Sequence, residues 1–377
     1  MVNGHAGINR TLELLLRKAP VIRLDDSSRV VVFSDLHIGD GGRNDDFMHN
    51  AHLFETLLER YYLKRAFSLV LNGDIEELMK FSCSSITNAW AGLYELFLRF
   101  RQSGFFWKIY GNHDLGLIDE KDYPLSPWLA ESLALRYGND TILLFHGHQA
   151  SPFLKTPFSI IGRPLFYFLR YIAKPTGIRN YSVSYKSRKR YAIEKAVYDF
   201  SNRAGIISII GHTHRPLFES LSKVDFLNYR IEELCRCYSS ADCDRRLEIE
   251  EEIGDLKDEL DSCYRKGFRK SIRSGRYGNI TIPSIFNSGC AIGKRGITAI
   301  EIEGGLIKLV YWHNRTASGS IPLDRRALEE IGSSGYSRVV LNEDRLDYVF
   351  SRIRLLANRK NSRDVLPVAT RSCPTYC

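Results

Sequence analysis

The sequence predicts an α/β fold, and three observations lead to this prediction. The chain of 377 residues is 44% hydrophobic and 26% charged, values that indicate a globular protein with a packed core. Short runs of β-branched and aromatic residues recur along its first two-thirds. Between these runs, apolar residues follow one another three and four positions apart, which is the period of an amphipathic helix. Alternating strands and helices are typical of α/β proteins.

The apolar runs define the expected strands in order along the chain. The first five are Arg29–Ser34, Phe67–Asn72, Phe105–Tyr110, Thr141–Phe145 and Ile206–Ile210. Helical spacing between them appears in residues 53–61 and again in residues 90–100. Three later runs have no helical pattern between them and therefore predict a second sheet. These are Ile280–Phe286, Gly296–Glu301 and Leu306–Trp312.

Two segments interrupt this pattern. Residues 154–203 mix aromatic and basic residues, with eleven Lys and Arg against two acids, so their net charge of +9 equals that of the whole chain. Residues 223–277 contain two amphipathic stretches joined by a short Ser-Ser-Ala-Asp link, which predicts an antiparallel helical hairpin. The predicted core comprises residues 1–153, 204–222 and 278–318, and residues 319–377 form a C-terminal extension.

Each of the first five strands runs directly into Asp, Asn or His residues. The five segments are Asp35-Leu-His37, Gly73-Asp74, Gly111-Asn112-His113-Asp114, His146-Gly-His148 and Gly211-His212-Thr-His214. They contain six of the ten His residues of the chain. Open α/β sheets bind ligands at the carboxyl ends of their strands, so we expect these side chains to converge at one end of a sheet.

The residue types predict a pair of divalent metal ions. Carboxylate, amide and imidazole groups are the ligands of ions such as Mn, Fe or Zn, and the absence of Cys from the five segments disfavours a thiolate zinc site. Seven candidate ligands are too many for one tetrahedral ion with an open position. Two ions sharing a carboxylate would clamp a phosphoryl group and activate water for in-line displacement.

The five segments, in this order, resemble those of the calcineurin-like metallophosphoesterase superfamily. The resemblance covers about Val30–Trp312, apart from the two interrupting segments. It implies a four-layer αββα sandwich of two mixed sheets, in which residues 154–203 form a helical lid insertion and residues 223–277 form a helical hairpin insertion. It also implies an enzyme that hydrolyses phosphoric ester or pyrophosphate bonds with metal-activated hydroxide.

The resemblance also assigns roles to single residues. One ion would be held by Asp35, His37, Asp74 and His214. The other would be held by Asp74, Asn112, His146 and His212, so that Asp74 bridges the two, and His148 is the alternative to His146. His113 would face the substrate as a general acid or charge stabiliser, oriented by Asp114, although Asp114 could instead cap the next helix. Asn287-Ser-Gly-Cys290 resembles the Asn-x-Gly-x turn of the superfamily.

The motif details favour one subfamily over another. Ser/Thr protein phosphatases of this superfamily carry Gly-Asp-x-Val-Asp-Arg-Gly, and the Arg is absent from the segment that begins at Gly73. Ser34-Asp-Leu-His-Ile-Gly39 and Gly211-His-Thr-His-Arg-Pro216 are more similar to UDP-2,3-diacylglucosamine pyrophosphohydrolases, which act in lipid A synthesis and carry an insertion where residues 154–203 lie. Their Gly-Asn-Arg-Asp and His-Gly-Asp are replaced here by Gly-Asn-His-Asp and His-Gly-His, which indicates a relative of these enzymes.

The basic insertion suggests what the substrate contacts. The apolar and aromatic residues 158–172 could bury acyl chains while neighbouring bases meet phosphate or anionic lipid groups. The candidate substrate residues are Arg163, Lys186, Arg188 and Arg190. A helical lid with a solvated basic face is the simpler interpretation. A nuclease acting on DNA or RNA is another, because clustered bases and tyrosines suit backbone contacts and base stacking.

Partners and location follow from the same segments. We expect residues 224–265 to form a homodimer or partner surface, because both apolar stripes of the hairpin need cover. A catalytically silent metal-binding scaffold acting through this hairpin is a non-enzymatic alternative. The sequence contains no signal-peptide core and no apolar run of the ~18–20 residues that span a membrane, which predicts a cytoplasmic protein. The apolar residues 158–172 predict that this protein contacts the inner face of the membrane.

Overall fold

The computed structural model describes residues 2–151, 187–218, 241–265, 282–292, 296–314, 328–332 and 334–356, together with single residues between 227 and 238. The apolar part of the predicted lid and most of the first helix of the predicted hairpin therefore lie outside the described residues. Arg163 and Lys186 lie outside them as well.

The larger sheet contains the first three predicted strands. Among the described residues its order is β12-β13-β11-β10-β2-β3-β4-β5. Its parallel half consists of β2 (Arg29–Phe33), β3 (Ser68–Asn72), β4 (Phe106–Ile109) and β5 (Leu129–Ala130). Its antiparallel half consists of β10 (Ile297–Glu303), β11 (Leu306–Asn314), β13 (Tyr336–Arg345) and β12 (Leu328–Glu330).

The smaller sheet carries the fourth and fifth predicted strands. Its order among the described residues is β1-β6-β7-β8-β9, and it mixes parallel and antiparallel pairs. Its strands are β1 (Val21–Leu24), β6 (Ser132–Tyr137), β7 (Asp140–Phe145), β8 (Ile207–Ile210) and β9 (Ile285–Asn287).

The composition of the second sheet differs from the prediction. β10 pairs antiparallel with β2, with Ile300 opposite Val32, so the late runs 296–301 and 306–312 extend the first sheet. Of the three late runs only 280–286, whose end forms β9, joins the second sheet as predicted, and that sheet is otherwise built around β7 and β8. The five segments with Asp, Asn and His therefore follow strands of two sheets rather than one.

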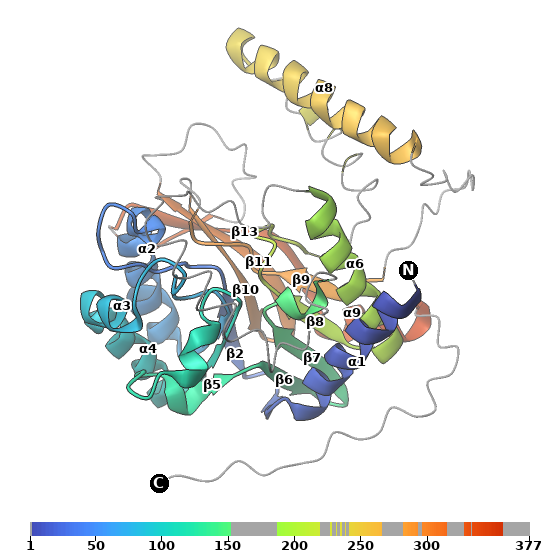
Figure 1. Ribbon diagram of the computed structural model, residues 1–377. Helices are drawn as coiled ribbons and strands as arrows, with labels where there is room; N and C mark the ends of the chain where they lie inside the picture. Colours follow the sequence, from blue (N-terminus) through green and yellow to red (C-terminus); the bar gives the residue numbers. More distant parts are fainter. Residues whose placement is uncertain are drawn as a thin grey trace.

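Hydrophobic alternation along the strands produces four layers, which confirms the predicted αββα sandwich. In β2, Val31 and Phe33 pack toward one set of helices, whereas Val30 and Val32 face the other sheet, as expected from the two-residue period of a strand. Helices α2 (Ala51–Leu57), α3 (Cys83–Ala89) and α4 (Ala91–Ser103) cover the larger sheet (Figure 1). Helices α1 (Val2–Lys18) and α6 (Ser187–Ala204) cover the smaller one.

Short helical turns complete the connections. α2 continues into a π-helix, η2 (Leu58–Tyr62), and a 3₁₀ turn, η3 (Leu63–Arg65). Further 3₁₀ turns are η1 (Asp46–His49), η4 (Leu115–Asp119), η5 (Ser126–Trp128) and η6 (His148–Ala150).

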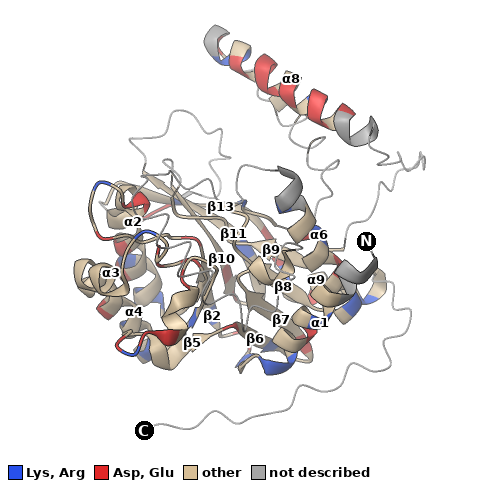
Figure 2. Ribbon diagram, in the orientation of Figure 1, with Lys and Arg blue, Asp and Glu red and all other residues tan. Residues whose placement is uncertain are grey.

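The described part of the hairpin insertion is α8 (Cys243–Arg265), which matches the second predicted arm. It carries nine acidic and four basic residues, and Figure 2 shows the acidic ones spread along the helix. Among the described residues, no helix has both the length and the apolar content needed to cross a bilayer.

The C-terminal extension is part of the sandwich. Its strand β13 pairs with β11 along Leu306–Asn314, and helix α9 (Leu346–Leu356) places Leu346, Phe350 and Ile353 in the core between the sheets. On the opposite face, the buried Arg338 of β13 donates a hydrogen bond to Glu301 of β10 over 3.1 Å. Tyr62 donates to the same carboxylate over 2.7 Å, which connects the π-helix to both strands.

We expect Glu301→Gln to reduce the free energy of unfolding by about 3–5 kcal/mol, because it removes the nearer counter-charge of the buried Arg338 guanidinium and leaves only Glu329, which is 3.5 Å away and 37% exposed. Urea unfolding followed by circular dichroism measures this loss. The matched control is Arg345→Ala, which removes an exposed ion pair with Asp347 from the end of the same strand and should leave the unfolding midpoint unchanged. Equal effects of the two substitutions would contradict the prediction.

Candidate metal centre

The five polar segments meet where the carboxyl ends of the two sheets lie together. Asn72, the last residue of β3, joins them directly, because its amide donates hydrogen bonds to the backbone oxygens of Phe145 (3.3 Å) and Ile209 (3.2 Å). The backbone oxygen of Asn72 also lies 3.1 Å from Nδ1 of His146. The prediction that these segments converge is confirmed, but the site lies between the edges of two sheets.

Six of the predicted ligands and His113 form three overlapping groups; within each group the ligand atoms all lie within 4.8 Å of one another. The groups are Asp35, His37 and His214; His37, Asp74 and His113; and Asp74, His146 and His212. Asp74 belongs to two of the groups, and in each of them its two neighbours are imidazoles. Asp35 and Asp74 are almost completely buried, at 0% and 1% exposure.

The backbone at these residues is strained in the same way. Five predicted ligands have a left-handed backbone with φ between 49° and 63°: Asp35, His37, Asp74, His212 and His214. Among the described non-glycine residues, Ala66 is the only other case. This conformation costs roughly 1–2 kcal/mol per residue and is usually maintained where function requires it. The strain therefore marks five of the seven predicted ligands.

Backbone hydrogen bonds orient the carboxylates of Asp35 and Asp74. The N–H of His212 donates to both oxygens of Asp35, over 3.0 and 3.1 Å, and the N–H of His113 donates to Oδ1 of Asp74 over 2.8 Å. Gly111 is required here, because a Cβ atom at that position would lie 2.1 Å from Oδ1 of Asp74. Each carboxylate is thus oriented by a segment that follows a different strand.

Electrostatics keep the carboxylates ionised in the metal-free protein. Burial raises the pKa of Asp74, but the nearby imidazoles, with His146 first, outweigh burial and hold this pKa well below its usual range. Burial lowers the pKa of His146, but the Asp74 carboxylate 3.1 Å from Nε2 more than compensates and raises it to about 9. Burial, reinforced by the charge of His146, lowers the pKa of His212 well below its usual value.

The residues fit a pair of cations. Nε2 of His37 and Nε2 of His214 lie 3.2 Å apart beside the Asp35 carboxylate, so lone pairs and negative charge converge on one point. Oδ1 of Asn112 is buried and accepts no hydrogen bond from the part of the chain that the structure describes, which leaves it available to an ion. The arrangement of oxygen and imidazole ligands suits Mn, Fe or Zn. Asp74 lies in one group with His37 and in another with His146 and His212, an arrangement that suits two neighbouring ions.

The partner of His113 differs from the prediction. Nδ1 of His113 lies 2.9 Å from both oxygens of Glu77 rather than against Asp114. The same carboxylate lies 3.0 Å from Nδ1 of His37, so Glu77 orients a predicted ligand and the predicted catalytic imidazole together. Burial lowers the pKa of His113, but Glu77 and then Asp74 outweigh it and raise this pKa to about 9.

Asp114 has a different task. Its carboxylate accepts hydrogen bonds from the N–H groups of Ile75 and Gly111 and pairs with the buried Lys108. Its side chain makes no capping bond to the following η4 turn. Lys108 also lies 3.1 Å from Glu76. Asp114 therefore holds the backbone beside Asp74 rather than the ring of His113.

Glu77 is not among the predicted site residues, because the segment Gly73-Asp-Ile-Glu-Glu-Leu78 indicated only a difference from the protein phosphatases. A signal was present in that segment. Glu76 and Glu77 lie directly between the apolar Ile75 and Leu78, and acidic residues in a buried stretch normally have partners.

The remaining predicted residues are placed only in part. His148 lies beside the second cluster, with ring centroids 5.5 Å from His146 and 6.3 Å from His212, while burial lowers its pKa to about 3. Arg190 is half-buried on α6. Arg188 lies on the same helix, and its side chain is outside the described residues. None of the three groups of candidate ligands includes His148.

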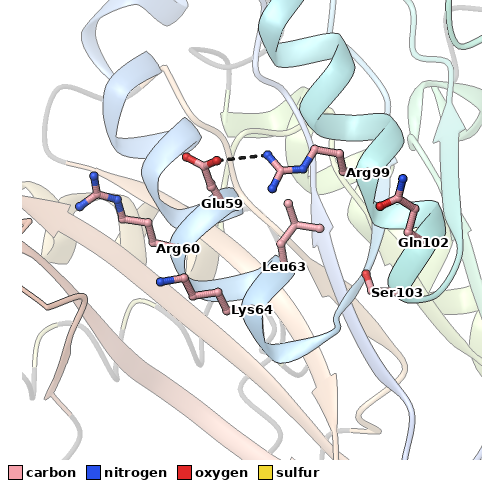
Figure 3. A pocket seen from close by; sticks show the side chains of 7 residues that line it. All are labelled: Glu59, Arg60, Leu63, Lys64, Arg99, Gln102 and Ser103. Atoms are coloured by element: carbon pink, nitrogen blue, oxygen red, sulfur yellow. Dashed lines mark hydrogen bonds and ion pairs between the residues drawn. The ribbon is translucent and has the colours of Figure 1, made fainter.

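A surface pocket with a volume of about 510 Å³ lies elsewhere (Figure 3). It is lined by residues at the carboxyl ends of helical segments, including Arg60, Lys64 and Arg99, and Arg99 pairs with Glu59 across it. Lys64 and Ser103 precede β3 and β4, so the pocket lies toward the amino ends of these strands. The candidate metal centre follows their carboxyl ends and is a separate site.

The fold and the paired clusters define a class of protein, the α/β sandwich hydrolases with a dinuclear metal site. Residues 28–218, just over half of the chain, match the family described as calcineurin-like phosphoesterase. The chain belongs to this family, whose members are metal-dependent phosphoric ester hydrolases. A comparison with curated protein sequences finds no match.

Solved structures give more distant likenesses. Vps29 from Entamoeba histolytica is 13% identical with a TM-score of 0.33, over 83% of this chain and 99% of that one. A conserved uncharacterised protein of Streptococcus pneumoniae, described as a predicted phosphoesterase, is 16% identical with a TM-score of 0.26, over 76% of this chain and 89% of that one. The family assignment depends on the sequence match and not on these structures.

We expect the affinity of the metal-free protein for Mn²⁺ to rise with pH, by about tenfold per unit between pH 7 and 8. The pKa of His146 is about 9, so its imidazole is protonated at neutral pH and must lose a proton to bind an ion, whereas above pH 9 this competition ends. Isothermal titration in buffers of different ionisation enthalpy measures affinity and proton release. His148→Ala should keep the same slope, because a pKa of about 3 leaves this ring neutral throughout. An affinity for Mn²⁺ that does not change with pH would contradict the prediction.

Proposed function

We propose that this protein hydrolyses a phosphodiester or pyrophosphate bond at the paired metal clusters, and that its substrate is a UDP-linked lipid similar to UDP-2,3-diacylglucosamine. The observation that supports hydrolysis most strongly is the position of Asp74. Its buried carboxylate lies in one group with His37, which also belongs to the Asp35 group, and in another with His146 and His212, and a carboxylate shared in this way suits two neighbouring ions.

The proposed ligand sets are those expected from the sequence. Asp35, His37, Asp74 and His214 would hold one ion, and Asp74, Asn112, His146 and His212 would hold the other. Manganese is proposed as the metal because carboxylate, amide and imidazole ligands suit it, with iron or zinc as alternatives. When bound, the pair would supply Lewis-acid polarisation of a phosphoryl oxygen and a more acidic water.

The side chains around the clusters would perform the rest of the chemistry. Glu77 holds Nδ1 of His113, so Nε2 is the atom of this imidazole that remains for the substrate. With a pKa of about 9, the ring is protonated at neutral pH and can donate a proton to the leaving oxygen or stabilise its charge. Asp114 and Lys108 maintain the backbone that carries this group.

The substrate class is supported by the sequence of the insertion. Residues 154–203 combine an apolar stretch with a net charge of +9 and connect the fourth and fifth motif segments. Acyl chains buried by residues 158–172 and phosphates met by Arg163, Lys186, Arg188 and Arg190 would account for both features. We accordingly propose a cytoplasmic location against the inner face of the membrane.

Two other features of the sequence define alternatives to test. The clustered bases and tyrosines of the insertion favour a nuclease as the second candidate function.

The hairpin at 224–265 is proposed as a homodimer surface. In α8, the only part of its two arms that is described continuously, Ile249 is buried while Leu247 is 67% exposed. A scaffold with no turnover would bind metal and leave every phosphoester intact.

We expect His212→Ala to reduce hydrolysis of bis(p-nitrophenyl) phosphate in the presence of Mn²⁺ by at least about 100-fold, since the variant removes a proposed ligand. Release of p-nitrophenol gives the rate. His52→Ala is the matched control, because His52 is exposed and belongs to none of the three ligand groups. If His212→Ala retains wild-type turnover, the proposed catalytic site is wrong.

The substrate prediction is tested by replacing residues 158–171 with a Gly-Ser linker. We expect hydrolysis of UDP-2,3-diacylglucosamine and flotation with anionic liposomes to fall by about tenfold or more, because the acyl contacts are lost. Hydrolysis of bis(p-nitrophenyl) phosphate should persist and serves as the internal control. Metal-dependent cleavage of DNA or RNA, without activity on the lipid, would favour the nuclease instead.

A further inference from the structure

Helix α6 connects the basic insertion to the metal centre. It begins at Ser187, within residues 154–203, and ends at Ala204, just before β8. Val197 and Phe200 are buried in the core that also contains α1 and the outer face of the smaller sheet. Ser201 lies 2.7 Å from Ser208 of β8, oxygen to oxygen. The helix is therefore anchored to the strand that leads into Gly211-His212-Thr-His214.

One acidic residue of α6 faces that segment. Glu194 is only 6% exposed, and its carboxylate accepts a hydrogen bond from Oγ1 of Thr213 over 3.0 Å. The Arg215 guanidinium donates to the same carboxylate through Nε, over 3.1 Å, and through Nη2. Thr213 and Arg215 alternate with His212 and His214 along the chain, so Glu194 holds the residues on either side of His214.

The other side of the segment is fixed by the sheet. The amide of Asn287, at the end of β9, donates hydrogen bonds to the backbone oxygen of Gly211 and to Oγ1 of Thr213, both over 2.9 Å. The hydroxyl of Thr213 thus accepts from Asn287 and donates to Glu194. Because Thr213 is completely buried, neither bond can be replaced by water without rearrangement of the segment.

From this arrangement we infer that Glu194 is a positioning residue, which sets the segment carrying His212 and His214. The inference rests on the proposed function insofar as it takes these two imidazoles as metal ligands. Both have a left-handed backbone, with φ of 63° and 54°, so small shifts of the residues between and beside them would misalign their rings.

The test is titration of the metal-free, full-length protein with Mn²⁺, read by calorimetry. We expect Glu194→Gln and Thr213→Val each to raise the dissociation constant for Mn²⁺ by about tenfold, the lower end of what loss of a supporting partner usually costs a metal site. Thr213→Ser keeps the hydroxyl and should restore an affinity close to that of the wild type. Lys195→Ala is the matched control, since Lys195 occupies the next position of α6 and pairs with Asp199 in solvent.

The outcomes distinguish a positioning role of Glu194 from a general effect of substitutions in α6. Unchanged affinity in both Glu194→Gln and Thr213→Val would overturn the inference, and so would an equal loss in Lys195→Ala. If Glu194→Gln does not fold, as judged by far-ultraviolet circular dichroism, the pair Thr213→Val and Thr213→Ser decides alone. A wild-type protein that binds Mn²⁺ but hydrolyses no phosphoester would remove the proposed function and leave this comparison of affinities intact.

Discussion

The site depends on two buried carboxylates, each fixed by a backbone N–H from a segment that follows another strand. His212, after β8 of the smaller sheet, holds Asp35, which follows β2 of the larger sheet. His113 holds Asp74 in the same manner within the larger sheet. Burial of two negative charges is costly unless cations or donors compensate them, so the surrounding imidazoles and the ions they can bind are a requirement of the fold as much as of the chemistry.

The packing of the sandwich explains how these polar groups reach one point. Aliphatic side chains such as Val32 and Leu144 fill the space between the sheets, whereas Leu143, the neighbour of Leu144 in β7, packs on the outer face of the smaller sheet. Toward the carboxyl ends this apolar layer stops, and Asn72 spans the two sheets with its amide. The change from apolar to polar contacts at one end of the same strands creates a buried location for charge.

Local patterns predicted most strands and the ligand segments, because a run of apolar residues followed by Asp or His is visible without knowing its neighbours. Pairing between distant segments was not visible. The β10 run could extend either sheet on periodicity alone, and its pairing with β2 depends on contacts across the whole chain. Glu77 was not predicted for a related reason, since its partners His37 and His113 lie 40 and 36 positions away in the sequence.

The C-terminal strands also determine how the larger sheet ends. Without β13, the long strand β11 would expose a row of unpaired backbone groups beside Val310 and Trp312, and such an edge readily recruits strands from other molecules. As described, the sheet instead ends in β12, which has three residues, two of them glutamates, and in β5, which has two. Short and charged borders of this kind discourage self-association through strand addition, and the extension supplies one of the two borders of this sheet.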